Sequence, residues 1–168
     1  MEHNQINNNG KNGVAFANTG NIGNFILNNT AKGNCPGCGS DGNGIVLMGE
    51  VTDTEVAGNE VTSNRRGIAL QLDGDAPDHN TVSDNKAEKN LAEGILIESD
   101  DNQVSDNRGR RNGSDGVAVT GGGNTVGGNT FSRNGGHCIC TVPGNTNGGG
   151  NAGTNNGQLP NVNINGGC

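Results

Sequence analysis

Residues 80–97 read NTVSDNKAEKNLAEGILI, and residues 102–119 read NQVSDNRGRRNGSDGVAV. The two stretches match position by position, and Asn80, Asn102 and Asn124 continue the match at intervals of 22 residues. The same interval relates three further columns: Val82, Val104 and Val126; Asn85, Asn107 and Asn129; Asn90, Asn112 and Asn134. A fixed period of this length indicates a solenoid, in which each repeat stacks on the one before it.

Weaker copies of the unit extend the repeat toward the N-terminus. One begins at Asn24 and contains an insertion from Cys35 to Asn43, and another begins near residue 54 and ends in an insertion from Asp73 to His79. Because units begin near residues 4, 24, 54, 80, 102 and 124, we expect about six coils within residues 1–142. Residues 143–168 are rich in Asn and Gly, and we expect them to form a tail that caps the last coil.

Each unit contains short stretches with apolar residues at alternate positions, such as Ile95 with Ile97 and Val117 with Val119. This pattern predicts β-strands, and no apolar run has the helical spacing and length of a typical helix. The 32 Gly residues and the many Asn residues suit corners with left-handed backbone. Asn85, Asn107 and Asn129 are expected to form a ladder inside one turn, where each amide donates to the next coil. The predicted fold is all-β, a single-stranded parallel β-helix with three short strands per coil and a rise of about 4.8 Å per coil.

The two quoted units resemble the right-handed parallel β-helix repeats of the pectate-lyase-like superfamily, and the resemblance covers about residues 4–142. It implies the right hand of the coil and an extracellular or cell-surface protein, although no signal peptide is visible at Met1. The superfamily contains polysaccharide lyases, glycoside hydrolases, uronan epimerases, periplasmic copper-handling proteins, phage tailspikes and adhesins. The fold therefore does not determine the activity.

Cationic residues follow the same interval. Lys89, Arg111 and Arg133 form one column, and Lys86 with Arg108 forms another three positions earlier. A strip of cations at the coil rise predicts a binding site for an acidic polysaccharide, in which a Lys or Arg near the sugar can act as a base. The alternative is that these side chains solvate an exposed sheet and pair with Glu88, Asp84 and Asp106.

Acidic residues gather in two loops that neighbouring coils are expected to bring side by side. Carboxylates from such loops are hard oxygen ligands for Ca²⁺, which lyases of the resembled superfamily often use, and a solvated acidic loop is the alternative. The run from Asp75 to His79 resembles the Asp-Pro-His-Asp element of alginate epimerases in a different order, so it assigns no catalytic residue. The candidate calcium ligands are Asp73, Asp75, Asp78, Asp100 and Asp101.

The chain has five Cys, so one of them lacks a partner within the chain. Cys35 and Cys38 are predicted to close a small disulfide loop, because a zinc site would need two further ligands close by. Redox exchange by the two thiols is the other alternative. Cys138 and Cys140 alternate on a strand. If the turn before them is shortened, both fall on the inward positions of Ile95 and Ile97, as core residues or with one bridged to Cys168.

The composition argues against several classes of binding partner. A net charge of −7 argues against nucleic acid, and no apolar run is long enough to cross a membrane. The absence of Trp and Tyr disfavours a neutral polysaccharide, and two Met with three scattered His give little to hold copper. We expect a protein that binds an acidic polysaccharide, with lyase or epimerase activity undecided. The alternative function is a non-catalytic structural or adhesive rod that self-assembles end to end.

Overall fold

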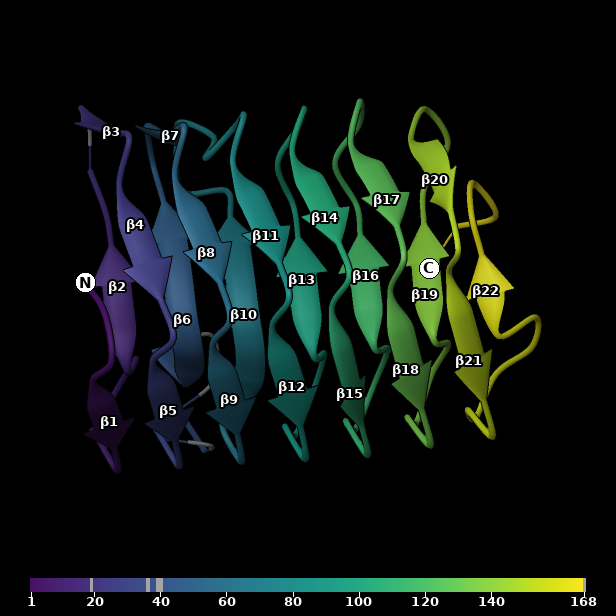
Figure 1. Ribbon diagram of the computed structural model, residues 1–168, viewed down its shortest axis with the longest axis horizontal. Helices are drawn as coiled ribbons and strands as arrows, with labels where there is room; N and C mark the ends of the chain where they lie inside the picture. Colours follow the sequence, from purple (N-terminus) through teal and green to yellow (C-terminus); the bar gives the residue numbers. More distant parts are fainter. Residues whose placement is uncertain (19, 36, 39–40, 168) are drawn as a thin grey trace.

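The computed structural model describes residues 1–18, 20–35, 37–38 and 41–167. The chain winds into a coil, and the strands of each coil pair in parallel with the strands of the next coil (Figure 1). The predicted parallel β-helix with three short strands per coil is therefore confirmed. Within the described ranges, no helix has the length and apolar character needed to span a membrane.

Three long sheets run along the rod, and we number them in the order in which the chain visits them within a coil. Sheet I contains β4 (Phe25–Leu27), β8 (Glu55–Ala57), β11 (Thr81–Ser83), β14 (Gln103–Ser105), β17 (Thr125–Gly127) and β20 (Thr146–Gly149). Sheet II contains β1 (Gln5–Asn7), β5 (Thr30–Lys32), β9 (Glu60–Thr62), β12 (Lys86–Glu88), β15 (Arg108–Arg110), β18 (Thr130–Ser132) and β21 (Ala152–Thr154). Sheet III contains β2 (Val14–Phe16), β6 (Asn43–Met48), β10 (Arg66–Gln71), β13 (Ile95–Ile97), β16 (Val117–Val119), β19 (Ile139–Thr141) and β22 (Val162–Asn163). A short pair, β3 (Asn21–Ile22) and β7 (Val51–Thr52), lies beside them.

Identical side chains lie over one another inside the coil, as the repeat predicts. Val104 pairs with Val82 on one side and with Val126 on the other, and all three side chains are fully buried. Each such Val contributes about 1.5–3 kcal/mol of hydrophobic free energy. The same column continues through Val56 and Ile26, so a narrow apolar core runs along the axis.

Asparagine ladders form the corners between sheets, and we number them in chain order. The first contains Asn80, Asn102 and Asn124, the second Asn85, Asn107 and Asn129, and the third Asn90, Asn112 and Asn134. The side-chain amide of Asn107 donates to Val82 O at 2.8 Å and to Asn129 Oδ1 at 3.0 Å, and its backbone N–H also donates to Asn129 Oδ1. The residue before it, Asp106, has a φ of 56°, which lies in the left-handed region that Asn, Asp and Gly tolerate best. The predicted ladder is confirmed, and it satisfies backbone groups that the corner would otherwise bury without partners.

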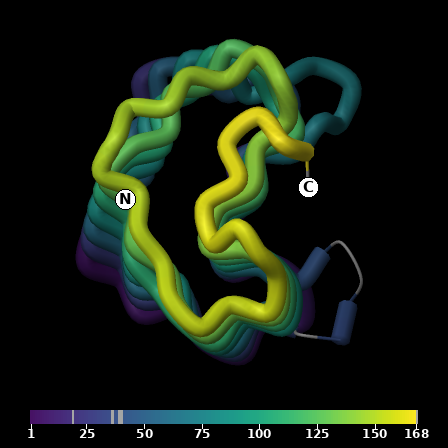
Figure 2. Tube along the Cα trace, turned by 90° about the vertical axis from the view of Figure 1, so that its right-hand side faces the viewer, coloured from purple at the N-terminus to yellow at the C-terminus, as the bar shows by residue number. Residues whose placement is uncertain are grey.

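The two ends of the rod differ from the simple repeat. Asn4 aligns with Asn29, so the first coil joins at the second ladder rather than at the ladder of Asn80. The tail contributes β20, β21 and β22, which continue all three sheets by one more coil. Viewed along the axis, the coils superpose as a closed ring, from which the teal insertion near Asp73–His79 projects sideways (Figure 2).

Candidate functional site

Lys89, Arg111 and Arg133 form what we call the basic corner, at the turn between sheets II and III. Their φ angles are 55°, 58° and 56°, and all three side chains are exposed. Each directly precedes an asparagine of the third ladder, and the backbone and side-chain hydrogen bonds of that ladder join the three coils. The backbone positions that carry the cations are therefore spaced at the strand distance of about 4.8 Å.

The other two predicted cations lie on the outer face of sheet II, where Lys86 pairs with Arg108 in register. Lys86 Nζ lies 3.0 Å from Glu60 Oε1 and 3.7 Å from Glu88 Oε2, so its charge is balanced by two carboxylates. Arg108 is exposed and, among the described residues, has no ion pair. Arg110, which was not among the five predicted cations, is bound to Glu88 at 3.3 Å.

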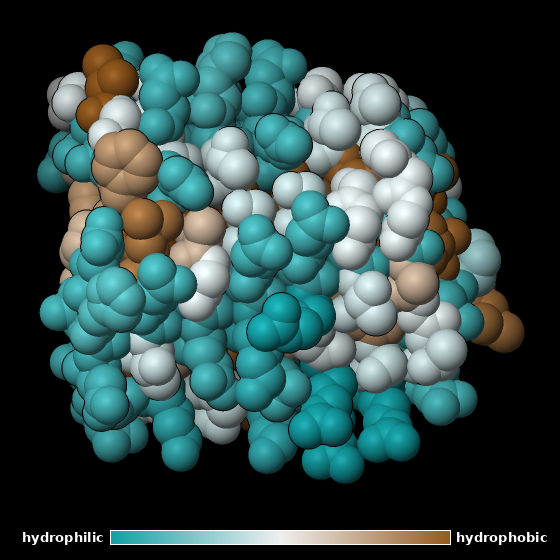
Figure 3. All heavy atoms as spheres, viewed as in Figure 1, coloured by the Kyte–Doolittle hydropathy of each residue, from teal (hydrophilic) through white to brown (hydrophobic). Residues whose placement is uncertain are grey.

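Asp84 and Asp106 do not pair with these cations within the described chain. The basic corner and Arg108 consequently present charge to solvent without a local counter-ion among the described residues. In the space-filling view, strongly hydrophilic side chains project from the lower edge of the molecule, below β15 and β18 (Figure 3). The structure thus keeps part of the predicted cationic strip open to a ligand.

The five candidate calcium ligands lie at separate positions and do not form one cluster. Asp73 and Asp75 face each other across an isolated antiparallel bridge within the loop. Asp78 Oδ1 accepts the backbone N–H of Asp100 at 3.0 Å, and Asp100 Oδ1 accepts that of Gly122 at 2.6 Å. Asp101 occupies a corner with a φ of 54°. No three of these five residues converge closely enough to share an ion.

An acidic cleft of about 370 Å³ lies between the Asp73–His79 insertion and the short strands β3 and β7. Glu50, Asp75, Asp78 and His79 line it, together with the exposed side chain of Ile22. The sequence placed the acidic loops next to each other but did not indicate Glu50. The cleft lies on the coils that precede the basic corner.

Cys35 and Cys38 form a disulfide, as predicted. Cys138 is a free, fully buried thiol, and burial raises its pKa to about 11. Cys140 is disulfide-bonded, and Cys168 lies outside the described residues. The condition under which Cys138 and Cys140 would take the columns of Ile95 and Ile97 is not met, although Cys138 does pack in the apolar core. The turn before β19 keeps its full length, so Ile139 and Thr141 take those columns through Val117 and Val119.

The sequence reasoning missed a row of polar side chains on sheet III, which we call the polar row: Arg66, Glu93, Asp115 and His137. They occupy equivalent positions in four successive coils, as the backbone hydrogen bonds that follow them show. Arg66 Nε lies 2.8 Å from Glu93 Oε2, and both side chains are less than one-fifth exposed. The signal was present, because Glu93, Asp115 and His137 are 22 residues apart. It was obscured because the residue type changes at every step.

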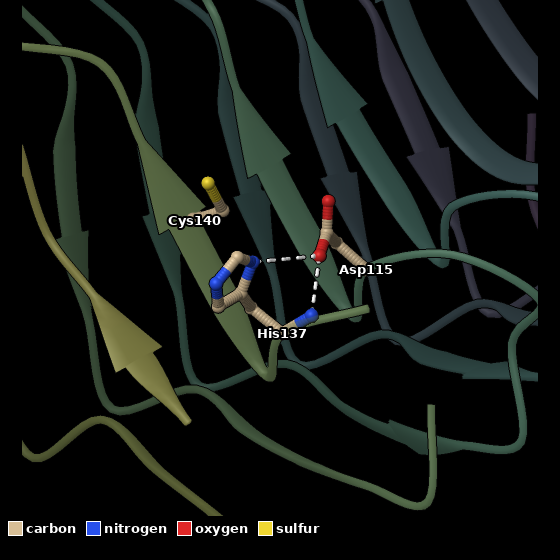
Figure 4. Close-up of side chains that lie close together, drawn as sticks. All are labelled: Asp115, His137 and Cys140. Atoms are coloured by element: carbon tan, nitrogen blue, oxygen red, sulfur yellow. Dashed lines mark hydrogen bonds and ion pairs between the residues drawn. The ribbon is translucent and has the colours of Figure 1, made fainter. Parts of the chain in front are cut away.

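Asp115 and His137 contact each other at the far end of the polar row, and Cys140 lies beside them on β19 (Figure 4). Asp115 Oδ1 accepts the backbone N–H of His137 and lies 3.3 Å from its Nδ1. The side chains of His137 and Asp115 are 9% and 13% exposed, and Cys140 is fully buried. A carboxylate oxygen, an imidazole nitrogen and a sulfur all lie within 4.8 Å of one another.

Comparison with known proteins assigns the family. Residues 1–166 match the family described as "Periplasmic copper-binding protein (NosD)". The chain belongs to the NosD family. No curated protein matches it. Among solved structures, a double mutant of the periplasmic alginate epimerase AlgG is similar, with a TM-score of 0.61, 15% sequence identity and coverage of 94% of this chain. The chain spans 42% of the length of that structure, and at this identity the similarity concerns the fold alone.

The described residues of this NosD-family chain do not fit a copper site as they stand. Copper sites combine several imidazole, thiolate or thioether ligands. Among the described residues, Asp115, His137 and Cys140 are the one group of three metal-ligating side chains. The sulfur of Cys140 is bonded in a disulfide, which leaves one imidazole and one carboxylate.

Proposed function

We propose that this NosD-family protein binds an acidic polysaccharide along the basic corner and the neighbouring face of sheet II. The observation that carries the proposal is the column of exposed cations Lys89, Arg111 and Arg133, which the third asparagine ladder holds at the coil spacing. A uronate polymer carries one carboxylate per sugar ring, a repeat comparable to the coil rise of about 4.8 Å. Successive coils can therefore contact successive sugars.

The charge distribution supports this choice of ligand. The protein carries a net charge of −7, so a general attraction to polyanions is not expected from the whole molecule. The exposed cations at the basic corner are a local exception, and they come from consecutive coils. Binding there requires a ligand whose negative charges are regularly spaced and can lie along the axis of the rod.

The location we propose is the periplasm or the cell exterior. The family is described as periplasmic. The Cys35–Cys38 disulfide supports the same location, because disulfides persist in oxidising compartments and are rare in the cytosol. Acidic polysaccharides are accessible to a protein in either place.

Binding to alginate and polygalacturonate, measured by calorimetry at low and physiological salt, tests the proposal. The double variant Arg111→Glu with Arg133→Glu is expected to bind about tenfold more weakly, because two exposed contacts of about 0.2–1 kcal/mol each become repulsive. The matched control combines Lys11→Glu with Gln103→Glu and Gln158→Glu, which changes the net charge by the same amount at exposed positions outside sheet II. Equal weakening by both variants, or no binding by the unmodified protein, would overturn the proposal.

The same samples separate binding from catalysis. Appearance of ultraviolet-absorbing unsaturated sugars would show β-elimination, and a change in uronate composition without cleavage would show epimerisation. Repeating the titration with calcium and with a chelator tests whether Asp73, Asp75 and the other acidic residues contribute. Concentration-dependent filaments without polysaccharide binding would instead favour a structural rod.

A further inference from the structure

Three different ligand atoms meet where β16 and β19 begin. Asp115 precedes β16, His137 precedes β19 in the next coil, and Cys140 lies within β19 (Figure 4). Their oxygen, nitrogen and sulfur atoms lie within 4.8 Å of one another. All three residues are buried, whereas the cationic strip described above is exposed.

Asp115 and His137 both retain an atom that can bind an ion. Asp115 Oδ1 takes the contacts from His137, and no hydrogen bond to Oδ2 occurs within the described chain. Only one ring nitrogen of His137 contacts the carboxylate, and the other has no hydrogen bond to a described residue. The 3.3 Å contact between Asp115 Oδ1 and His137 Nδ1 already brings two of the ligand side chains together.

Cys140 is the ligand that oxidation blocks, because its sulfur is bonded in a disulfide. A dithiol reductant transfers two electrons and two protons to that bond, leaves one thiol at Cys140 and one at its partner cysteine, and becomes a disulfide itself. Binding of a divalent ion then displaces the thiol proton to solvent, and the thiolate becomes a ligand. The oxidised site has two ligands, and the reduced site has three.

We propose that reduction of the Cys140 disulfide creates a binding site for a divalent ion of the zinc type. The ligands are the Cys140 thiolate, a ring nitrogen of His137 and the Asp115 carboxylate, with water at the fourth position. Thiolate and imidazole suit zinc, and three protein ligands with one open position are an established coordination pattern for this ion. With metal–ligand bonds of about 2.0–2.3 Å, the three side chains need to close by only about 1 Å.

The test uses cobalt(II), which has a visible spectrum and a thiolate charge-transfer band when bound by sulfur. The full chain carries Cys35→Ser and Cys38→Ser, so that this second pair of thiols does not compete for metal. Cobalt is titrated into the protein before and after reduction with a dithiol, which is then removed under anaerobic conditions. The reduced protein is expected to bind one equivalent with the thiolate band, and the oxidised protein is expected to show no such band.

Variants identify the ligands. Cys140→Ser and His137→Ala are each expected to abolish the band, and Asp115→Asn is expected to lower the affinity about tenfold or more. The controls Cys138→Ala and His79→Ala remove a thiol and an imidazole outside the site and should leave the titration unchanged. Circular dichroism verifies that each variant is folded. An undiminished band in His137→Ala, equal binding by the oxidised protein, or no binding by the reduced protein would overturn the proposal.

Discussion

A single asparagine at a corner satisfies two backbone groups of the preceding coil. Asn107 is fully buried, and its amide donates to Val82 O while its carbonyl accepts from Asn85. Asn107→Ala removes these contacts and leaves buried polar groups without partners, each of which costs about 1–3 kcal/mol. We expect Asn107→Ala to lower the free energy of unfolding by about 2–4 kcal/mol, measured by urea denaturation.

The comparison for that variant is Asn151→Ala in the same ladder. Asn151 is only partly buried and belongs to the last coil, although its amide also donates to a backbone carbonyl, Val126 O. Water can replace the contacts of Asn151 more readily than those of Asn107. Similar losses of unfolding free energy in the two variants would contradict the view that burial determines how much each ladder asparagine stabilises the protein.

Cys138 makes the stability depend on pH in the alkaline range. Burial raises its pKa from 9.0 to about 11 in the folded protein. Between these values the unfolded chain loses the thiol proton while the folded chain keeps it, so the free energy of unfolding falls as pH rises. Cys138→Ala should show a smaller decline between pH 9 and pH 11 than the unmodified protein, measured by thermal melting without reductant. An identical decline would show that other groups cause it.

At the scale of the residue, the sequence predicts the positions of residues that recur unchanged from coil to coil. It does not predict the contacts of residues whose type changes. Val82, Asn85 and Asn90 reappear in the following coils, so their columns were predictable. The Asp115–His137 contact was not predictable. A carboxylate and an imidazole at equivalent positions of two repeats read as a change of residue type, and the sequence does not show that they contact each other. The orientation of Cys140 depended on the length of one turn, which the sequence left open.

At the scale of the element, the strands of sheet II fit together through differences in side-chain size. Ala87, Gly109 and Phe131 occupy one inward column, and the large ring of Phe131 lies next to the smallest residue. A Cβ at Gly109 would approach Ala87 O to 1.9 Å and Phe131 Cε1 to 2.7 Å. Glycine at this position therefore makes room for the phenylalanine of the next coil.

Gly109→Ala is expected to destabilise the protein by about 1–3 kcal/mol, the usual cost of overpacking a core. Gly122→Ala is the matched substitution, because its Cβ would meet only Asp100 Oδ1 at 3.8 Å, an ordinary contact. Urea denaturation of both variants gives the comparison. If Gly109→Ala were no less stable than Gly122→Ala, the packing of Phe131 would not restrict this position.

The elements show why the sequence predicted strands better than sites. Alternating apolar residues place Ile95 and Ile97 inward regardless of what the outer face carries. Whether Lys86 is available to a ligand depends instead on its distances to Glu60 and Glu88, which belong to two different strands. The acidic loops that the sequence predicted as calcium ligands use Asp78 and Asp100 to accept hydrogen bonds from backbone N–H groups.

At the scale of the whole molecule, every coil contacts only its neighbours, so the end coils are expected to open more easily than the middle ones. Amide hydrogens of β12 (Lys86–Glu88) are covered by coils on both sides, whereas β21 (Ala152–Thr154) has a described neighbour on one side. Hydrogen exchange followed by mass spectrometry should be at least about tenfold slower in β12. Uniform exchange along the rod would indicate that it opens as one unit.

Along the axis the charges are unevenly distributed. All 17 acidic residues lie at or before Asp115, and the acidic cleft belongs to coils that precede the basic corner. The sequence alone predicted this asymmetry, because in a solenoid the position of a residue in the chain determines its position along the axis. The described tail, by contrast, continues the sheets although its strands contain few apolar residues, and the pattern of hydrophobic residues gave little indication of that coil.

The projecting insertions show that the circumference of a coil is not fixed. Equivalent asparagines are separated by 30 residues from Asn29 to Asn59, by 26 from Asn59 to Asn85 and by 22 from Asn85 to Asn107, yet every pair is joined by the same amide contact. Extra residues therefore widen the rod sideways without lengthening it. Relatives of very different chain length can share one pitch, and foreign peptides grafted at Asp73–His79 should leave every rung in place.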